Sequence, residues 1–228
     1  AGAKIAKTAE EVFAKSDMIV KVKEPQPSEW VQLREDQILF TYLHLAPDPK
    51  QAKGLVKSGC TAIAYETVTD DKGTLPLLAP MSEVAGRLAI EAAGEAMRRS
   101  EGGAGILLGG VPGVPAGRVT VLGGGVVGTH AARMAVGLGA EVTIVDRSIP
   151  RLRQLDELFH GRVRTRYSTL DTIDAEISVA DAVIGAVLIH GAAAPKLVTR
   201  EMVRSMKAGA VVVDIAIDQG GCFETSRP

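Results

Sequence analysis

Apolar and polar positions change in short blocks along the chain, and the blocks predict alternating helices and strands. In the first third, runs rich in β-branched or aromatic residues predict strands at residues 18–23, 38–43 and 61–65. Thr8 with Glu11 three residues later is typical of a capping box, and a second helix is expected at residues 48–57, ended by Gly59. This order predicts βαβ crossovers and a mainly parallel sheet.

Between residues 80 and 99 the apolar positions recur with the period of a helix. One helix face is formed by Val84, Leu88, Ala92 and Ala96. We interpret this helix as the connector between two α/β domains, at residues 1–79 and 80–228, because the alternation becomes stricter after it.

The second domain repeats strand and helix with little interruption. Near-continuous apolar runs predict strands at residues 119–122, 141–146, 163–168, 182–187 and 210–218. Helices are expected at residues 126–138, 150–159, 173–180 and 199–206. Because such apolar strands are buried on both sides, the fold class predicted is α/β, with a Rossmann-type, doubly wound parallel sheet.

The strongest local motif is Gly-Gly-Gly-Val-Val-Gly at residues 123–128, a G-x-G-x-x-G between a predicted strand and a predicted helix. In this motif the first glycine allows a tight turn, the second lets the backbone approach a pyrophosphate, and the third permits close helix packing. These glycines are Gly123, Gly125 and Gly128, and the helix amides expected to face the anion belong to Val126 and Val127. The alternative is a glycine turn without a nucleotide.

Asp146 ends the next predicted strand, about 20 residues beyond the first glycine, where a carboxylate binds the adenosine ribose hydroxyls. The same charge repels a 2′-phosphate, so the predicted cofactor is NAD rather than NADP. Arg147 next to it weakens this preference.

Three further strand ends, at Ser168, Val187 and Asp218, are expected to face the cofactor crevice. Val187 either forms an apolar wall along the cofactor or packs in the core. Asp218 either caps a turn or works in a cleft, and strand parity places Asp214 on the same face.

In the first domain, Lys23 and His44 are the candidate polar groups. Lys23 alternates with valines on a predicted strand, which favours a solvent-facing lysine. His44 closes its strand, where a structural role is the more common one. The histidines show no ligand spacing, so no metal site is predicted.

Composition narrows the function classes. Lys plus Arg (26) nearly balance Asp plus Glu (27), so neither nucleic acid nor an anionic membrane is an expected partner. No apolar run has membrane-spanning length. Two distant cysteines fit a reducing compartment, and hence the cytoplasm. The start at Ala1 without methionine and the stop at Pro228 lead us to expect an internal fragment.

Several longer segments together resemble the bacterial L-alanine dehydrogenases, within the alanine dehydrogenase/pyridine nucleotide transhydrogenase family. They are Lys-Val-Lys-Glu-Pro (21–25), Phe-Thr-Tyr-Leu-His-Leu-Ala (40–46), Ala-Tyr-Glu-Thr-Val (64–68), Leu-Pro-Leu-Leu-Ala-Pro-Met-Ser-Glu-Val-Ala-Gly-Arg (75–87), Gly-Gly-Val-Pro-Gly-Val (109–114) and Val-Asp-Ile-Ala-Ile-Asp-Gln-Gly-Gly-Cys (213–222). The resemblance implies NAD-dependent, reversible oxidative deamination of L-alanine to pyruvate and ammonia by a homohexamer. It also implies that residues 1–79 are part of a substrate domain.

The same resemblance assigns roles to single residues. Lys23 would bind pyruvate, His44 would act as the catalytic acid/base, and Asp218 would lie by the nicotinamide. Cofactor contacts are implied for Ser82, Ser168, Val187 and Ile215. The family's N-terminal strand, with a substrate-binding arginine, is expected before Ala1, and its C-terminal part after Pro228. Two alternatives remain open: the NAD-binding component of a proton-translocating transhydrogenase, or an inactive NAD-binding fragment.

Overall fold

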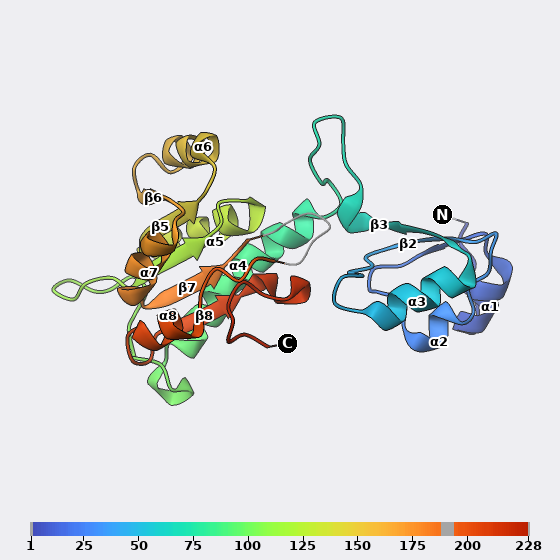
Figure 1. Ribbon diagram of the computed structural model, residues 1–228, viewed down its shortest axis with the longest axis horizontal. Helices are drawn as coiled ribbons and strands as arrows, with labels where there is room; N and C mark the ends of the chain where they lie inside the picture. Colours follow the sequence, from blue (N-terminus) through green and yellow to red (C-terminus); the bar gives the residue numbers. More distant parts are fainter. Residues whose placement is uncertain (1, 188–193, 228) are drawn as a thin grey trace. The chain divides into compact units, whose positions relative to one another are not determined.

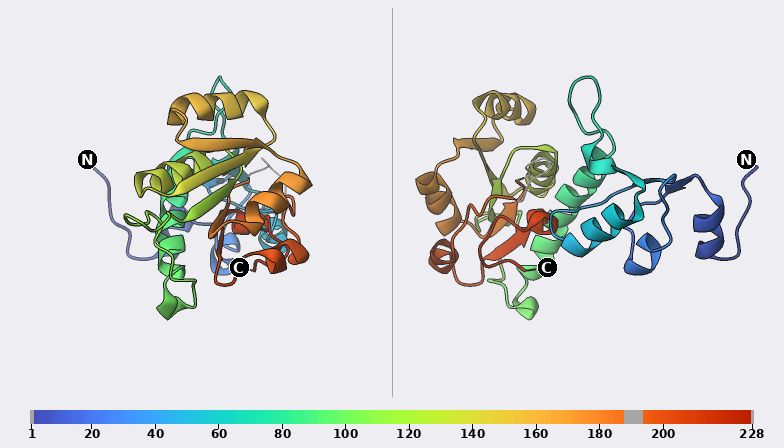
Figure 2. Two further views of the ribbon diagram at one scale, coloured as in Figure 1. Left: turned by 90° about the vertical axis from the view of Figure 1, so that its left-hand side faces the viewer. Right: turned by 45° about the vertical axis from the view of Figure 1, so that its right-hand side comes forward.

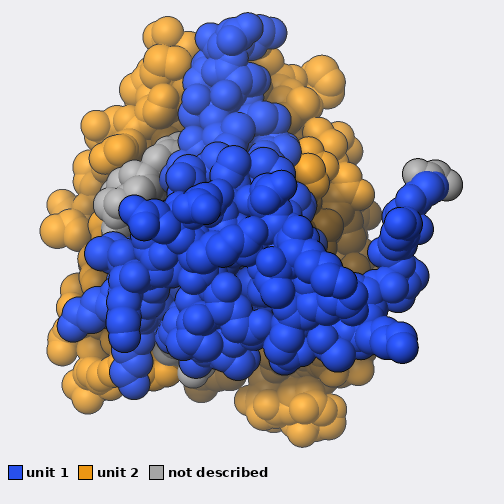
Figure 3. Space-filling view, turned by 90° about the vertical axis from the view of Figure 1, so that its right-hand side faces the viewer, with its two compact units in different colours: residues 1–78 blue, residues 79–228 orange. Residues whose placement is uncertain are grey.

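The computed structural model describes residues 2–187 and 194–227, with only the backbone at residue 218. The chain divides into two compact units, Ala1–Leu78 (unit 1) and Ala79–Pro228 (unit 2), which are coloured separately in Figure 3. Each unit has its own parallel sheet and its own hydrophobic core. The predicted α/β fold class is confirmed.

Unit 1 is built around a three-stranded parallel sheet in the order β1-β2-β3 (Figure 1). Its elements are α1 (Ala9–Lys15), β1 (Met18–Val20), α2 (Pro27–Trp30), β2 (Ile38–Thr41), α3 (Pro49–Ser58), β3 (Thr61–Ala64) and the 3₁₀ helix η1 (Tyr65–Thr67). Local signals explain the helix ends: the Thr8 hydroxyl accepts the N–H of Glu11 at 3.2 Å, and Gly59 ends α3 with a φ of 72°.

The strands of unit 1 end earlier than the sequence predicts. β1 stops at Val20 and β2 at Thr41. Beyond β2, the backbone N–H of His44 donates to the Glu66 carboxylate at 2.7 Å instead of to a neighbouring strand. The predicted placement of Lys23 and His44 within strands is therefore wrong, because both lie in the loops that follow the strand ends.

Unit 2 contains a five-stranded parallel sheet in the order β6-β5-β4-β7-β8 (Figure 1). Its strands are β4 (Arg118–Leu122), β5 (Glu141–Asp146), β6 (Val163–Tyr167), β7 (Ala182–Gly185) and β8 (Val211–Asp214). Its helices are α4 (Ala79–Ala96), α5 (Val126–Gly137), α6 (Ile149–Phe159), α7 (Leu170–Ser178) and α8 (Arg200–Ser205), with the 3₁₀ helices η2 (Arg99–Glu101) and η3 (Ile215–Gln219). The strand order reverses at β4, which creates the topological switch point of a doubly wound sheet.

Helices cover both faces of this sheet (Figure 2). Residues of α4, α5 and α6 form one core with one side of the strands, and residues of α7 and α8 form a second core with the other side. In β4, for example, Val121 enters the first core and Leu122 the second. Burial on both sides is the reason that these strands read as continuous apolar runs.

The packed face of α4 is not the one that the sequence pattern predicts. The buried residues of α4 are Gly86, Ala89, Ile90 and Ala93. Val84 and Leu88, on the face marked out by the sequence pattern, are 49% and 53% exposed. A Cβ at Gly86 would lie 2.3 Å from the carbonyl oxygen of Val127, so α5 approaches the backbone of α4 directly. Close approach at Gly86 leaves no room for a side chain there, and Val84 and Leu88 remain outside this face.

The last predicted strand is wrong beyond Asp214. β8 ends there, and the next five residues form η3. The Asp214 carboxylate accepts the N–H of Cys222 at 3.0 Å and the hydroxyl of Ser226 at 2.6 Å, which folds the chain back on the strand end. Strand parity therefore does not relate Asp214 to Asp218.

Candidate functional site

The carboxyl ends of the five parallel strands of unit 2 meet at one edge of the sheet. The register aligns Leu122 with Val145 and Gly185, Asp146 with Tyr167, and Gly185 with Asp214. Several residues predicted to bind the cofactor lie at or just after these ends, namely Gly123, Asp146, Ser168, Val187 and Ile215. Open α/β sheets bind ligands outside this edge, next to the switch point.

Close packing requires two glycines of the loop at residues 123–128. Gly123 has a φ of 99°, and a Cβ there would lie 2.7 Å from the carbonyl oxygen of Ala186. A Cβ at Gly128 would lie 1.8 Å from the carbonyl oxygen of Gly123. A side chain at either position would collide with backbone, so these glycines maintain the turn from β4 into α5.

Gly125 differs from its neighbours because space is open around it. It is the N-cap residue of α5, with a φ of −65° that any residue can adopt. A Cβ built at Gly125 meets no atom of the described residues within 4 Å. The amides of Val126 and Val127 lie in the first turn of α5, where N–H groups have no intrahelical acceptor. Open space before a helix N-terminus fits a phosphate group.

Asp146 is held against the glycine loop. The Gly124 N–H donates to Oδ2 of Asp146 at 2.7 Å, and the Ser148 N–H donates to Oδ1 at 2.7 Å. An ionised carboxylate offers about four acceptor positions, so two bonds orient the group and leave capacity for ligand hydroxyls.

Arg151, which the sequence analysis did not single out, also contacts this loop. From the first turn of α6, its Nε–H donates to the carbonyl oxygen of Gly124 at 2.7 Å, and a terminal N–H donates to the Thr129 hydroxyl at 2.7 Å. Asp146 thus accepts the N–H of Gly124, and Arg151 donates to the carbonyl oxygen of the same glycine. Arg147, the arginine considered from sequence, is exposed. The available signal was the position of Arg151 in the first turn after the Ser148 cap.

The other predicted cofactor contacts occupy the same edge or the adjoining helix. Val187 is half-buried against the second core, and its Cγ2 would lie 3.2 Å from a Cβ at Gly123, so it borders both the core and the loop. The Ser168 N–H donates to the carbonyl oxygen of Asp146 at 3.0 Å. Ser82 is half-buried in the first turn of α4, and Ile215 opens η3.

Asp218 lies in η3, and its side chain is outside the described residues, so its catalytic role stays a prediction. Asp214 rather than Asp218 ends the strand, and it holds the chain at residues 222–226 through its hydrogen bonds. Burial, together with the nearby Asp214 charge, raises the pKa of the Cys222 thiol far above its usual range. Cys222 therefore remains a protonated packing residue.

In unit 1, the backbone of His44 adopts a left-handed conformation, with a φ of 43°. Histidine tolerates this region better than most residues, but the conformation still needs support. The Glu66 carboxylate provides it by accepting the N–H groups of Leu43 at 3.1 Å and His44 at 2.7 Å.

The His44 ring is fixed by two neighbours. Its Nδ1 contacts the Glu24 carboxylate in a short hydrogen bond, and its ring lies parallel to that of Tyr42 with centroids 5.8 Å apart. The Tyr42 hydroxyl in turn donates to the carbonyl oxygen of Leu77 at 2.6 Å. Lys23, in contrast, is 82% exposed and lies 3.8 Å from Glu24 through its Nζ.

Glu24 and Glu66 are therefore components of this site that the sequence analysis missed. Burial alone would raise the pKa of Glu24, but the hydrogen bond with His44 and the nearby charges of His44 and Lys23 outweigh it and lower that pKa. The position of Glu24 directly after Lys23 was a usable signal. No local pattern marked Glu66, because it lies 22 residues from His44 in the sequence.

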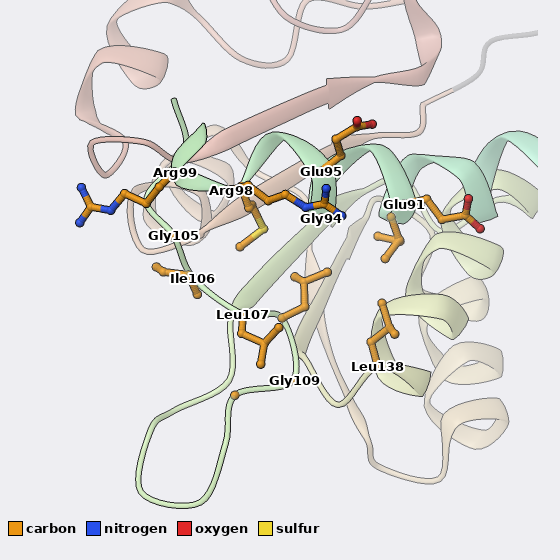
Figure 4. A pocket seen from close by; sticks show the side chains of 14 residues that line it. Glu91, Gly94, Glu95, Arg98, Arg99, Gly105, Ile106, Leu107, Gly109 and Leu138 are labelled. Carbon is orange, nitrogen blue, oxygen red and sulfur yellow. The ribbon is translucent and has the colours of Figure 1, made fainter. Parts of the chain in front are cut away.

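Unit 2 also carries a groove of 840 Å³ between α4, the loop at residues 105–110 and Leu138 (Figure 4). Apolar groups line it together with charged ones such as Glu95 and Arg98. None of the described residues along this groove is a predicted site residue.

Neither a metal cluster nor a membrane-spanning helix is present among the described residues. Residues 2–187 and 194–227 contain no group of three or more His, Cys, Asp or Glu placed to hold a metal ion. Within the same residues, no helix combines the length and the apolar character needed to cross a membrane.

Comparison with known proteins covers the whole chain. The family model "Alanine dehydrogenase/PNT, N-terminal domain" matches residues 1–85, and "Alanine dehydrogenase/PNT, C-terminal domain" matches residues 89–228. An alanine dehydrogenase of Halomonas elongata is 57% identical over 228 residues, which are 100% of this chain and 62% of that protein. One of Bacillus subtilis is 55% identical over 225 residues, 99% of this chain and 59% of that protein.

Solved structures show the same relationship. An L-alanine dehydrogenase structure has a TM-score of 0.89 and 50% identity, covering 100% of this chain and 63% of that one. A transhydrogenase from Sinorhizobium meliloti has a TM-score of 0.77 and 29% identity, covering 96% and 64%. The chain thus spans less than two thirds of these relatives. Both family models and the identity along its length show that it belongs to the alanine dehydrogenase/PNT family.

Proposed function

We propose that this protein catalyses the NAD-dependent, reversible oxidative deamination of L-alanine to pyruvate and ammonia. The observation that carries the proposal is the 54–57% identity, along almost the whole chain, with proteins named alanine dehydrogenase. The geometry at the carboxyl edge of unit 2 supports binding of the cofactor. In unit 1, His44 with Glu24, Glu66 and Tyr42, here called the His44 cluster, supports acid/base chemistry.

The proposed cofactor site is the loop at residues 123–128 with Asp146. The open space at Gly125 and the first amides of α5 suit a pyrophosphate, and Asp146 suits the ribose hydroxyls. Its negative charge disfavours a 2′-phosphate, which supports NAD over NADP. Ser82, Ser168, Val187 and Ile215 are proposed as further contacts.

NAD, when bound, supplies the hydride acceptor for Cα of alanine. The protein's own residues manage charge and protons. Lys23 has an exposed ammonium that can pair with the substrate carboxylate. His44 takes one proton of the water that adds to the iminium carbon and returns it to nitrogen. It then takes the hydroxyl proton as the C–N bond breaks, which gives pyruvate and ammonia. Asp218 is proposed to favour the cationic iminium and to orient that water.

We further propose that the protein acts in the cytoplasm as a homohexamer. Cys60 and Cys222 are free thiols, which is the state expected in a reducing compartment. The exposed apolar residues of α4, among them Met81, Val84 and Leu88, support association. Sedimentation equilibrium of the full-length protein tests the hexamer.

The activity is tested with the product of the complete open reading frame. NADH oxidation is expected only when pyruvate and ammonia are both present, and kcat/KM with NADH should exceed that with NADPH. The likeness to a transhydrogenase makes transfer between two nucleotides the competing activity. Reduction of an NADP analogue by NADH, without any need for pyruvate, would favour that alternative.

A further inference from the structure

The contact between Glu24 and His44 constrains which nitrogen of the His44 ring carries a proton, as well as the position of the ring. The Glu24 carboxylate contacts His44 Nδ1, and both side chains are largely buried, at 23% and 24% exposure. An ionised carboxylate can only accept hydrogen bonds, so the nitrogen that faces it must carry the proton. In a neutral imidazole the other nitrogen, Nε2, is then unprotonated.

Neighbouring residues also fix the orientation of the His44 ring. Glu66 fixes the backbone N–H of His44, and Tyr42 lies parallel to the ring at a centroid distance of 5.8 Å. Tyr42 is itself tied to the carbonyl oxygen of Leu77. The imidazole therefore has its backbone, one nitrogen and one face fixed by three different residues.

Glu24 also approaches Lys23, but that contact is of another kind. The Nζ–Oε2 distance is 3.8 Å and the Lys23 side chain is 82% exposed, so water screens the pair. The lowered pKa of Glu24 indicates that the carboxylate stays ionised at neutral pH. The partner that Glu24 orients is His44 rather than Lys23.

We propose that Glu24 is a positioning residue that holds His44 in the tautomer protonated at Nδ1, so that Nε2 is the nitrogen available to exchange protons with a substrate. The catalytic consequence rests on the proposed function, whereas the tautomer does not. A carboxylate in this arrangement stabilises the imidazolium that forms when Nε2 takes a proton.

The tautomer is measured in the 228-residue chain itself, by long-range ¹H–¹⁵N correlation spectra of ¹⁵N-labelled protein at pH 8. The sequence has four histidines, so the signals of His44 are assigned by their loss in His44→Asn. Wild-type His44 is expected to show a protonated Nδ1 and an unprotonated Nε2. An unprotonated Nδ1 in the wild type overturns the proposal without any variant of Glu24.

Glu24→Gln supplies the second test, because an amide can donate as well as accept and no longer forces a proton onto Nδ1. The spectrum should shift to a mixture of tautomers. Glu29→Gln is the matched control: Glu29 has the same 23% exposure and forms a short ion pair with Lys21 in the same segment. That variant should leave His44 unchanged. An unchanged His44 spectrum in folded Glu24→Gln contradicts the proposal.

Activity of the full-length protein adds a functional measurement. Glu24→Gln is expected to lower kcat by about tenfold or more while the Kd for NADH is unchanged, because the imidazole loses the carboxylate that fixes its tautomer. An unchanged kcat contradicts the positioning role. If the wild type does not deaminate alanine but His44 shows the expected tautomer, the proposed function fails and the assignment of Glu24 stands.

Discussion

The glycine loop of unit 2 and the His44 cluster of unit 1 are built in different ways. The loop is defined by backbone geometry within six consecutive residues, where two glycines prevent collisions with carbonyl oxygens. The His44 cluster is assembled from carboxylates 20 and 22 residues away in the sequence. A site made from local backbone geometry can be recognised by its spacing, whereas a site made from distant side chains becomes visible only in the folded chain.

The largest effect is expected when the His44 cluster loses its proposed acid/base group. In the full-length protein, His44→Ala should reduce turnover by about 10²- to 10⁴-fold, the usual contribution of general acid/base catalysis. NADH affinity should be nearly unchanged, because the proposed cofactor site depends on unit 2. Steady-state kinetics and NADH titration measure the two quantities. Near-normal turnover would restore the structural reading of His44.

A substitution in the glycine loop should lower the free energy of unfolding rather than act directly on the chemical step. Gly128→Ala places a Cβ 1.8 Å from the carbonyl oxygen of Gly123 and is expected to cost at least 1–3 kcal/mol, the usual range for overpacking. Gly137→Ala is the control, since Gly137 is the last residue of α5 and its Cβ meets no described atom within 4 Å. Chemical denaturation of both variants measures the difference. Equal stability would show that the loop does not need Gly128.

Cofactor preference tests the side chain that joins the loop to the strand edge. Asp146→Ala removes both the acceptor for ribose hydroxyls and the charge facing a 2′-phosphate, so the ratio of kcat/KM for NADH over NADPH should fall by about tenfold or more, equivalent to about 1.4 kcal/mol. Asp146 also holds Gly124, and Asp146→Asn keeps an acceptor for that N–H while removing the charge. A ratio unchanged in both variants would exclude Asp146 from selectivity.

A smaller effect is expected on the free energy of unfolding at low pH. Hydrogen bonding to His44 and the nearby charges overcome burial and lower the pKa of Glu24 from its ordinary 4.5. A carboxyl group whose pKa is lower in the folded than in the unfolded protein contributes stability at pH values above its unfolded pKa. This contribution is lost as the pH falls through the folded-state pKa. Denaturation of Glu24→Gln should therefore show a weaker decline in unfolding free energy below about pH 4.5 than the wild type. Equal declines would mean that Glu24 contributes nothing to acid sensitivity.

The sequence predicted the elements best where periodicity and end signals agree. The order of strands and helices in unit 2, and the turn at residues 123–128, follow from apolar runs and glycine spacing. The packed face of α4 was not predictable in this way, because it is centred on Gly86, where α5 approaches the helix backbone, and a glycine adds nothing to an apolar pattern. β8 misled the prediction because its apolar run continues past Asp214, and only the contacts of Asp214 with residues 222–226 show where the strand ends.

Within the candidate site, too, residues with a fixed sequence spacing were predicted and residues placed by long-range contacts were not. Asp146 was identified because its distance from the glycines is nearly constant in this type of fold. Arg151, Glu24 and Glu66 have no such spacing rule, and their roles follow from contacts to backbone or ring atoms that are distant in sequence. Long-range side-chain contacts are set by packing of the whole unit, which a local pattern does not record.

The central claim, that the loop of unit 2 binds a dinucleotide, is tested most directly by filling the space at Gly125. Gly125 has a φ that other residues adopt, and its Cβ position is free of described atoms, so Gly125→Val should fold with a near-normal melting temperature. Isothermal titration of the 228-residue chain with NADH should show one site in the wild type and at least a hundredfold weaker binding in Gly125→Val, equivalent to about 2.7 kcal/mol. Wild-type affinity in a folded Gly125→Val, or a folded wild type that does not bind NADH, would contradict the account.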